Sequence, residues 1–278
     1  MAEEPLRFAT VAPNAERFGN PRDAAEVGRV AEEAGWDGYF TWDSLFFWGE
    51  SSRPVYDPWV ALSAVAMATE RIRIGTCVAV LPRYKPQALA MTLASLDVLS
   101  EGRLTFGVGI GFSADEFEVF GEAGEARVRA EKLDEGLEVI TRLWSGDEVN
   151  HQGDHFEVHD VVLDPVLVQT PRIPIWVGGD SEPALRRAAR WDGWIGPTEP
   201  WKDTWTPEDL VSFRERIEKE RDSSQPFEIA WSGASTPEDG DMVEAYRQAG
   251  ATWWVELIDW TRGSYDKAIA RVAAGPPR

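Results

Sequence analysis

The feature that most constrains the fold is a regular alternation of short apolar runs and longer amphipathic segments along the chain. Eight runs rich in β-branched and aromatic residues are expected to be strands: Leu6–Val11, Gly38–Trp42, Ile72–Val80, Leu104–Val108, Ile175–Val177, Gly193–Ile195, Phe227–Ala230 and Thr252–Leu257. Helical periodicity covers residues near 22–34, 57–69, 86–99, 126–144, 183–190, 207–222, 238–249 and 264–274. Eight strands, each followed by a helix, predict an α/β fold of the (β/α)8 TIM-barrel class.

One segment interrupts this alternation between the fourth helix and the fifth strand. The stretch VNHQGDHFEVHDVVLDPVLVQTPRIP is expected to form a hairpin that turns at Gly153-Asp154, followed by a proline-rich return. We interpret it as an insertion at about residues 147–174 within a single domain spanning residues 1–278. The insertion holds His151, His155 and His159 at a spacing of four residues. Because every second side chain of a strand points to the same face, we expect the three histidines on one solvated face rather than in a metal site.

The charge balance narrows the class of partner. The 28 Lys and Arg residues against 48 Asp and Glu give a formal charge of −20, which repels nucleic acids and anionic membranes. No apolar run approaches the ~20 residues of a membrane span, and the opening MAEEPLRFAT lacks a signal-like apolar region, so we expect a cytoplasmic protein. The single cysteine, Cys77, excludes an internal disulfide framework. A small-molecule substrate is the expected partner.

The carboxyl ends of the strands carry the functional information, because active sites of such barrels lie there. The stretch RLTFGVGIGFSADEF ends the fourth strand with Gly107, Gly109 and Gly111 at every second position, which does not match the dinucleotide-binding G-x-G-x-x-G. In VGGDSEPAL, Gly178 and Gly179 precede a helix start whose backbone N–H groups can bind an anion. The alternatives are a strand packed with small residues and an ordinary helix cap.

Two longer stretches strongly resemble the luciferase-like monooxygenase family: RIRIGTCVAVLPRYKPQALAMTLASLDVLSEGRLTFGVGIGFSADEFEVFG and PIWVGGDSEPALRRAARWDGWIG. That family comprises bacterial luciferase, alkanesulfonate-type monooxygenases that use FMN, and oxidoreductases that use the deazaflavin coenzyme F420. The likeness is clear over roughly residues 6–200, and LDVLSEGRLTFGVGIG is its most specific part. It implies a (β/α)8 barrel that holds a flavin-like ring at the strand ends.

The resemblance also implies a set of cofactor-binding residues. In the F420-using branch a cis peptide that does not precede proline backs the ring, and the matching bond is Cys77-Val78. Asp43 matches a position near the pyrimidine side of the ring, with a turn cap as the alternative. GVGIG resembles the strand end where missing side chains let the cofactor tail pass, and GGDS resembles the phosphate seat. The expected cofactor-binding residues are Asp43, Ser44, Cys77, Val78, Gly109, Ile110, Gly111, Asp115, Gly178, Gly179, Asp180 and Ser181.

Departures from the family pattern bear on the cofactor and the substrate. In bacterial luciferase an arginine on the fourth strand holds the flavin phosphate, and the matching residue is Ile110, which disfavours luciferase-style FMN binding. In the F420-dependent sugar-phosphate dehydrogenases a histidine follows the second-strand aspartate and an acid follows the fourth-strand G-x-G. Ser44 and Phe112 occupy those positions, so a sugar-phosphate substrate is not carried over.

The predicted function is hydride transfer between F420 and an organic substrate. The alternatives are an FMN-dependent monooxygenase that uses reduced flavin and O2, and a barrel that binds a flavin without turnover or has lost its cofactor. Asp43 and Glu256 are the candidate general acids or bases. An apolar or planar substrate is expected if the mouth of the barrel is lined by Trp42, Phe46, Phe47, Trp48 and Trp231. The alternative for these aromatics is barrel-to-helix packing. A homodimer is the assembly that we consider.

Overall fold

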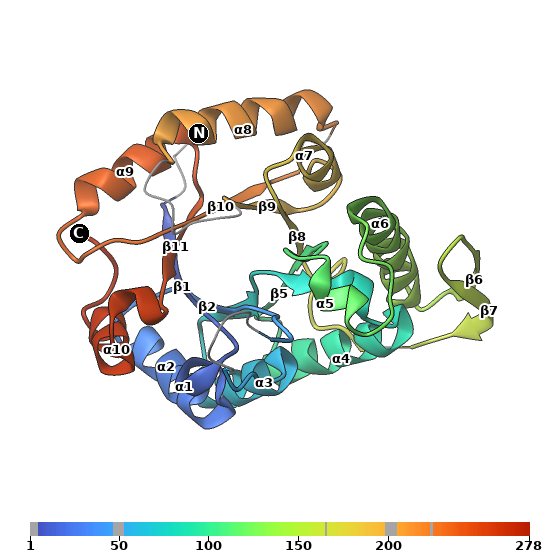
Figure 1. Ribbon diagram of the computed structural model, residues 1–278, viewed down its shortest axis with the longest axis horizontal. Helices are drawn as coiled ribbons and strands as arrows, with labels where there is room; N and C mark the ends of the chain where they lie inside the picture. The colour runs from blue at the N-terminus through green and yellow to red at the C-terminus, as the bar shows by residue number, and fades with distance from the viewer. Residues whose placement is uncertain (1–4, 47–52, 165, 198–204, 223–224) are drawn as a thin grey trace.

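A closed parallel barrel organises the chain. The computed structural model describes residues 5–46, 53–164, 166–197, 205–222 and 225–278. Hydrogen-bonded neighbours run β1, β2, β3, β5, β8, β9, β10, β11 and back to β1 (Figure 1), which confirms the predicted (β/α)8 barrel. The strands are β1 (Arg7–Ala12), β2 (Gly38–Thr41), β3 (Arg73–Thr76), β5 (Leu104–Gly109), β8 (Ile175–Gly178), β9 (Gly193–Gly196), β10 (Glu228–Gly233) and β11 (Trp253–Leu257).

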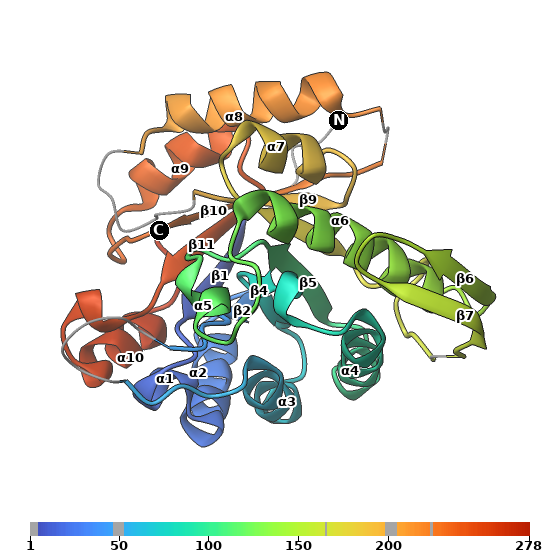
Figure 2. The same ribbon diagram turned by 45° about the vertical axis from the view of Figure 1, so that its right-hand side comes forward.

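The expected helices cover the outside of the barrel (Figure 2). They are α2 (Pro21–Glu33), α3 (Pro58–Ala68), α4 (Pro86–Leu99), α6 (Ala126–Leu143), α7 (Glu182–Ala188), α8 (Pro207–Glu220), α9 (Gly240–Ala249) and α10 (Tyr265–Ala273). The single turns α1 (Glu16–Gly19), α5 (Asp115–Glu118), η1 (Leu81–Arg83) and η2 (Trp260–Arg262) were not expected, because one turn leaves no periodicity to detect. Among the described residues, no helix is both long and apolar enough to cross a bilayer.

The third barrel strand is interrupted in the middle of the run predicted over Ile72–Val80. β3 ends at Thr76, and the short strand β4 (Ala79–Val80) resumes the pairing with β5. The peptide bond between Cys77 and Val78 is cis, as the resemblance implies. Cys77 and Val78 therefore leave the regular ladder at the carboxyl end of the barrel.

Successive side chains of each strand point alternately into the barrel and toward the helices, which divides the core into two layers. The inner layer fills the barrel and consists of Ala9, Val11, Phe40, Trp176, Ile195, Ala230, Trp253, Val255 and Leu257. The outer layer lies between the strands and the helices and includes Phe106, Val108 and Trp194. Because the interior is packed, a ligand meets the barrel at its mouth rather than in a channel.

The insertion forms the antiparallel hairpin β6 (Glu148–Gln152) and β7 (Glu157–Val162), which projects beside α6 (Figures 1 and 2). The expectation that its histidines share a solvated face is wrong for two of them. The side chains of His151 and His155 are only 8% and 17% exposed and face Glu135 and Glu131 of α6, while that of His159 is 66% exposed. The hairpin lies against α6, and a register shift at Val149/His151 breaks the simple parity. Within the described ranges, no group of His, Cys, Asp and Glu side chains is arranged to hold a metal ion.

Candidate active site

The residues predicted to bind the cofactor meet at the carboxyl ends of four neighbouring strand positions, β2, β3/β4, β5 and β8. Cys77, Val78, Ile110, Gly178 and Gly179 all keep partial exposure there, although the inner layer beneath them is buried. None of these five side chains is charged. The mouth of the barrel therefore has an apolar floor with accessible backbone.

Val78 explains why glycines stand on the strands beside it. A Cβ added to Gly109 would lie 2.8 Å from Cγ2 of Val78, and a Cβ on Gly178 would lie 2.8 Å from its Cγ1. A Cβ on Gly107 would lie only 1.9 Å from the carbonyl oxygen of Thr76. The expectation that missing side chains in GVGIG leave a passage for the cofactor tail thus needs correction at Gly109, because the side chain of Val78 fills that space.

Asp43 lies at the end of β2 in a dense hydrogen-bond network. Its Oδ2 accepts from the backbone N–H of Val80 at 2.8 Å and from the Tyr84 hydroxyl at 3.0 Å. Its Oδ1 pairs with Nη2 of Arg83 at 2.8 Å, and Nη1 of Arg83 reaches Glu116 Oε2 at 3.1 Å. Arg83 therefore links the segment after β2, the end of β4 and the helix α5.

Burial alters the protonation of two groups in this network. Burial raises the pKa of Glu116 above its usual range, and the facing Arg83 guanidinium only partly offsets that effect. Burial likewise raises the pKa of Tyr84, and the neighbouring Asp43 carboxylate adds to the rise. Tyr84 is therefore a neutral donor to Asp43 at physiological pH.

Cys77 is not suited to act as a nucleophile. Burial raises the pKa of its thiol to about 12, and the Ser232 hydroxyl beside it offsets only part of that shift. Since the thiolate is the reactive form, a thiol with this pKa is inert at neutral pH. Cys77 contributes backbone and volume to the floor.

Glu256 does not lie in the predicted site. It alternates with the inward residues Val255 and Leu257, so its side chain faces the outer layer and is fully buried. Its carboxylate accepts from Ser235 Oγ at 2.5 Å and Trp254 Nε1 at 2.8 Å, and it also pairs with Arg262 and Arg271. The proposed acid-base role is therefore wrong; this carboxylate ties β11 to the helices.

The aromatic residues predicted at the mouth divide into three groups. Trp231 is an outer-layer residue, only 1% exposed and stacked on Tyr246 at 5.3 Å, so the packing alternative holds for it. Trp42 packs with the inner layer, and Phe46 lies 6.5 Å from the ring of Phe120, which follows α5. Phe47 and Trp48 lie outside the described residues.

The remaining predicted residues line the edges of the site. Ser44 donates its backbone N–H to Asn14 Oδ1 at 3.0 Å, and Asp115 is exposed at the start of α5. Ser181 is the N-cap residue of α7 but makes no side-chain cap bond. Gly179, before Asp180, has φ of +119° and accepts from Trp194 Nε1 at 2.7 Å.

The structure also assembles residues that the sequence did not single out. Arg83, Tyr84 and Glu116 complete the Asp43 network, and Asn14 holds the segment at Ser44. Arg129 of α6 donates Nη1 to the carbonyls of Ile110 and Gly111 at 3.0 and 2.9 Å, behind the fourth strand end. The sequence gives a signal only for Arg83 and Tyr84, which follow the end of the third strand after Leu81 and Pro82.

Comparisons with known proteins identify the family and agree with the fold. A family model described as luciferase-like monooxygenase matches residues 6–271. The chain belongs to the luciferase-like monooxygenase family. Among curated luciferase-like relatives, an F420-dependent glucose-6-phosphate dehydrogenase of Microbacterium testaceum is 35% identical over 189 residues, covering 67% of this chain and 54% of the relative. An F420-dependent hydroxymycolic acid dehydrogenase of Mycobacterium tuberculosis is 30% identical over 190 residues, 68% of this chain and 52% of that protein.

Solved structures share the luciferase-like fold along nearly the whole chain. An F420-dependent secondary alcohol dehydrogenase in complex with an F420-acetone adduct matches with a TM-score of 0.78 at 19% identity, over 97% of this chain and 98% of that one. A monooxygenase from Streptomyces bottropensis matches with a TM-score of 0.79 at 19% identity, over 96% of each chain. By contrast, the chain spans just over half the length of the two curated relatives described above.

Proposed function

We propose that this luciferase-like protein is an oxidoreductase that transfers a hydride between coenzyme F420 and an organic substrate. The observation that carries the proposal is the apolar floor at the barrel mouth, where Val78 packs over Gly109 and Gly178 beside Asp43. An uncharged floor with accessible backbone suits a flat deazaflavin ring. Relatives named as F420-dependent dehydrogenases support the choice of cofactor.

The protein's contribution is to place the ring and exclude water, while the bound cofactor supplies the hydride chemistry. Val78 would support the ring, and Asp43, fixed by Val80, Tyr84 and Arg83, would orient its edge. Asp43 remains the candidate acid or base. The cofactor tail would leave over Ile110 and Gly111 toward the segment from Gly178 to Ser181.

The substrate class that we propose is apolar. Apolar side chains with large exposure gather after β5, with Phe112 71%, Val119 56% and Phe120 64% exposed, and Phe46 reaches Phe120 from the segment after β2. Ser44 and Phe112 stand where the sugar-phosphate dehydrogenases carry a histidine and an acid, so glucose 6-phosphate is not proposed. We also retain a cytoplasmic location as a prediction.

Cofactor choice is tested by titrating the protein with F420 and with FMN, following the quenching of tryptophan fluorescence. We expect the tighter dissociation constant for F420, because Ile110 cannot make the charge-assisted phosphate contact of the luciferase arginine. Equal or tighter binding of FMN would favour the alternative, an FMN-dependent monooxygenase. Binding of neither would favour a barrel that has lost its cofactor.

The phosphate seat is tested by Ser181→Asp. Aspartate is as good an N-cap residue as serine, so the fold should persist while the added carboxylate repels an anionic tail. The matched control is Ser264→Asp at the N-cap of α10. We expect weaker F420 binding only in the first variant, and equal binding in both would place the tail elsewhere. A bulky residue at Gly179 is a poorer test, since φ of +119° and Ala184 Cβ at 2.9 Å strain any side chain there.

A further inference from the structure

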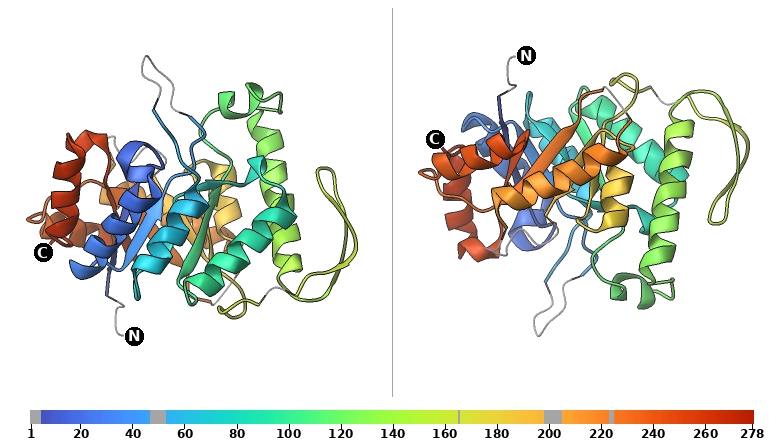
Figure 3. Two further views of the ribbon diagram at one scale, coloured as in Figure 1. Left: turned by 90° about the horizontal axis from the view of Figure 1, so that it is seen from below. Right: turned by 90° about the horizontal axis from the view of Figure 1, so that it is seen from above.

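Two tryptophan rings meet at right angles at the mouth of the barrel. Trp42 directly follows β2, and Trp260 begins the single turn η2, which follows β11. Their ring centroids lie 5.9 Å apart, and the ring planes form an angle of 88°. Strands β2 and β11 both pair with β1, and both views of Figure 3 show the C-terminal segments beside the N-terminal ones. We call Trp42 and Trp260 the aromatic corner.

The aromatic corner is partly exposed, whereas most of the described tryptophans are buried. Trp176 and Trp253, which fill the inside of the barrel, are 2% and 1% exposed. Trp42 and Trp260 are both partly exposed. Trp42 packs against the inner layer at the mouth, as Val78 does. The corner therefore adjoins the apolar floor of the proposed ring site.

The turn that carries Trp260 is held by its own hydrogen bonds. Arg262 of this turn donates Nε to the carbonyl of Leu257 at 3.0 Å and Nη1 to that of Ser235 at 2.8 Å. The same guanidinium pairs with the buried carboxylate of Glu256. A ring that is already fixed in place loses little freedom when a ligand packs on it, which favours binding.

Arg53 bears on the charge of the group that the corner can receive. Its guanidinium carbon lies 4.4 Å from the centroid of the Trp260 ring, so a cation already occupies that position. Glu16 Oε1 pairs with Arg53 Nη1 at 2.6 Å and offsets its positive charge. The formal charge of −20 repels anions in addition. A cationic ligand would meet Arg53 and an anionic ligand would meet the acidic surface, so the corner suits an uncharged group.

We propose that the aromatic corner binds an uncharged aromatic ring of the substrate beside the deazaflavin, and that Trp260 sets this preference. Two perpendicular rings present a face and an edge. A third ring can contact both, because aromatic pairs favour offset-stacked and edge-to-face arrangements. The inference rests on the proposed function for the neighbouring cofactor, while the corner itself consists of side chains of this chain.

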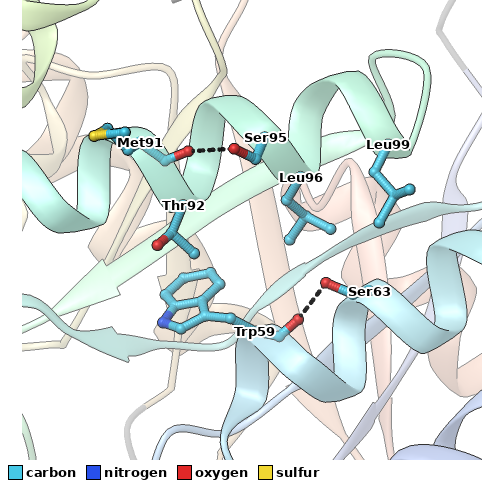
Figure 4. A pocket seen from close by; sticks show the side chains of 7 residues that line it. All are labelled: Trp59, Ser63, Met91, Thr92, Ser95, Leu96 and Leu99. Atoms are coloured by element: carbon cyan, nitrogen blue, oxygen red, sulfur yellow. Dashed lines mark hydrogen bonds between the residues drawn. The ribbon is translucent and has the colours of Figure 1, made fainter.

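A hollow on the outside of the barrel does not offer the same contact. It lies between α3 and α4, has a volume of about 340 Å³ and is lined by residues that include Trp59, Thr92 and Leu96 (Figure 4). Trp59 is 6% exposed, so most of its ring is already covered. Because these helices cover the outer side of the strands, the hollow is separated from the mouth by the barrel wall.

The test is the binding of acetophenone and of cyclohexyl methyl ketone, measured by saturation-transfer NMR titrations with and without F420. Both ketones are uncharged and have the same number of carbon atoms, but only acetophenone has an aromatic ring. We expect acetophenone to bind more tightly. Trp260→Leu should weaken acetophenone binding about three- to tenfold, the contribution of one aromatic pair, and leave the other ketone unchanged. Trp260→Phe keeps a ring and should retain most of the affinity.

Trp191→Leu is the matched control. Trp191 is also partly exposed, and the guanidinium carbon of Arg172 lies 5.3 Å from its ring centroid. It precedes β9, at the opposite end of the barrel from the mouth. This variant should bind both ketones as the wild type does. Equal binding of the two ketones to the wild type, or an equal effect of Trp260→Leu and Trp191→Leu, would overturn the proposal.

A second measurement uses the wild-type chain labelled with fluorotryptophan, so it does not depend on the folding of Trp260→Leu. Acetophenone should shift the fluorine NMR signals of Trp42 and Trp260, assigned from single Trp→Phe variants, and leave that of Trp191 in place. Unshifted signals of Trp42 and Trp260 would overturn the proposal. If acetophenone binds at Trp260 but F420 does not bind, the proposed function fails and the aromatic corner stands. If F420 binds but acetophenone does not, only the corner is wrong.

Discussion

At the scale of single residues, Arg83 has the strongest predicted effect on stability. Its side chain is 8% exposed and faces the carboxylates of Asp43 and Glu116, which are 3% and 10% exposed. Removing one partner of a buried ion pair leaves the other charge uncompensated, at a cost of about 3–5 kcal/mol. We expect Arg83→Gln to lower the free energy of unfolding by that amount in urea titrations.

Arg29→Gln is the matched control for that measurement. Arg29 also bridges two carboxylates, those of Glu26 and Glu33, but on the solvent face of α2. Exposed pairs contribute little, so its unfolding curve should overlay that of the wild type. If both variants lose the same free energy of unfolding, the buried ion pairs of Arg83 stabilise the protein no more than the exposed pairs of Arg29.

Glu116 gives a pH-dependent prediction. Because its pKa is raised in the folded protein, the native state binds its proton more tightly than the unfolded chain does. That contribution to stability is full below the unfolded pKa of about 4.3 and is lost as the pH rises through the folded pKa. The stability of the wild type relative to Glu116→Gln should therefore fall between pH 4 and neutral pH, measured by urea unfolding at each pH. A difference that grows with pH would show that pairing with Arg83 outweighs burial.

At this scale the sequence predicts candidate residues at the barrel mouth but not the hydrogen bonds and ion pairs between them. Asp43, Cys77 and the strand-end glycines were found because they sit at strand ends or match a family motif. Arg83 and Glu116 are ordinary charged residues in sequence, and only the fold brings them 3.1 Å apart. The prediction for Glu256 was wrong for a related reason. A shift of one residue along β11 turns the side chain of an acid at the strand end from the barrel mouth to the helix layer.

At the scale of elements, Glu135 of α6 makes several of the contacts that hold the inserted hairpin to that helix. Glu135 accepts from the backbone N–H groups of His155 and Phe156 at 3.0 and 2.7 Å and pairs with His151 at 3.1 Å. Burial opposes ionisation of Glu135, but these hydrogen bonds outweigh it and lower its pKa. The contribution of Glu135 to stability is therefore present above the pKa that this group has in the unfolded chain. It is lost as the pH falls through the lower pKa of the folded protein.

We expect Glu135→Ala to release the hairpin while the barrel stays folded. Losing the acceptor for two backbone donors costs about 1–3 kcal/mol, so hydrogen exchange of residues 148–162 should accelerate by on the order of tenfold or more. Glu138→Ala, which removes a more exposed acid 3.7 Å from His151, is the control. Equal acceleration in both variants would mean that Glu135 is not the anchor.

The element pattern was the most predictable level of this structure. Apolar residues recur with period 2 in strands and with period 3.6 in helices. In a chain of repeated strand-helix units these patterns leave few possible folds, since each amphipathic helix must cover the strand before it. The hairpin was recognised from its turn at Gly153-Asp154. Its docking on α6 was not, because the register shift at Val149/His151 has no sequence signature that parity would detect.

At the scale of the whole molecule, the homodimer considered from the sequence predicts how stability depends on protein concentration. If unfolding separates two copies, mass action makes the folded dimer more stable as the protein concentration rises. A chain of this length unfolds with a large entropy, so a tenfold increase in concentration should raise Tm by only on the order of 1 °C per decade. The slope of Tm against the logarithm of protein concentration must therefore be measured over several decades of concentration, with unfolding followed by tryptophan fluorescence. The wild type should show this slope, because unfolding of a dimer involves dissociation of the two copies. A wild-type Tm that stays constant over three decades would mean that the folded barrel is stable without association, which would contradict the homodimer prediction.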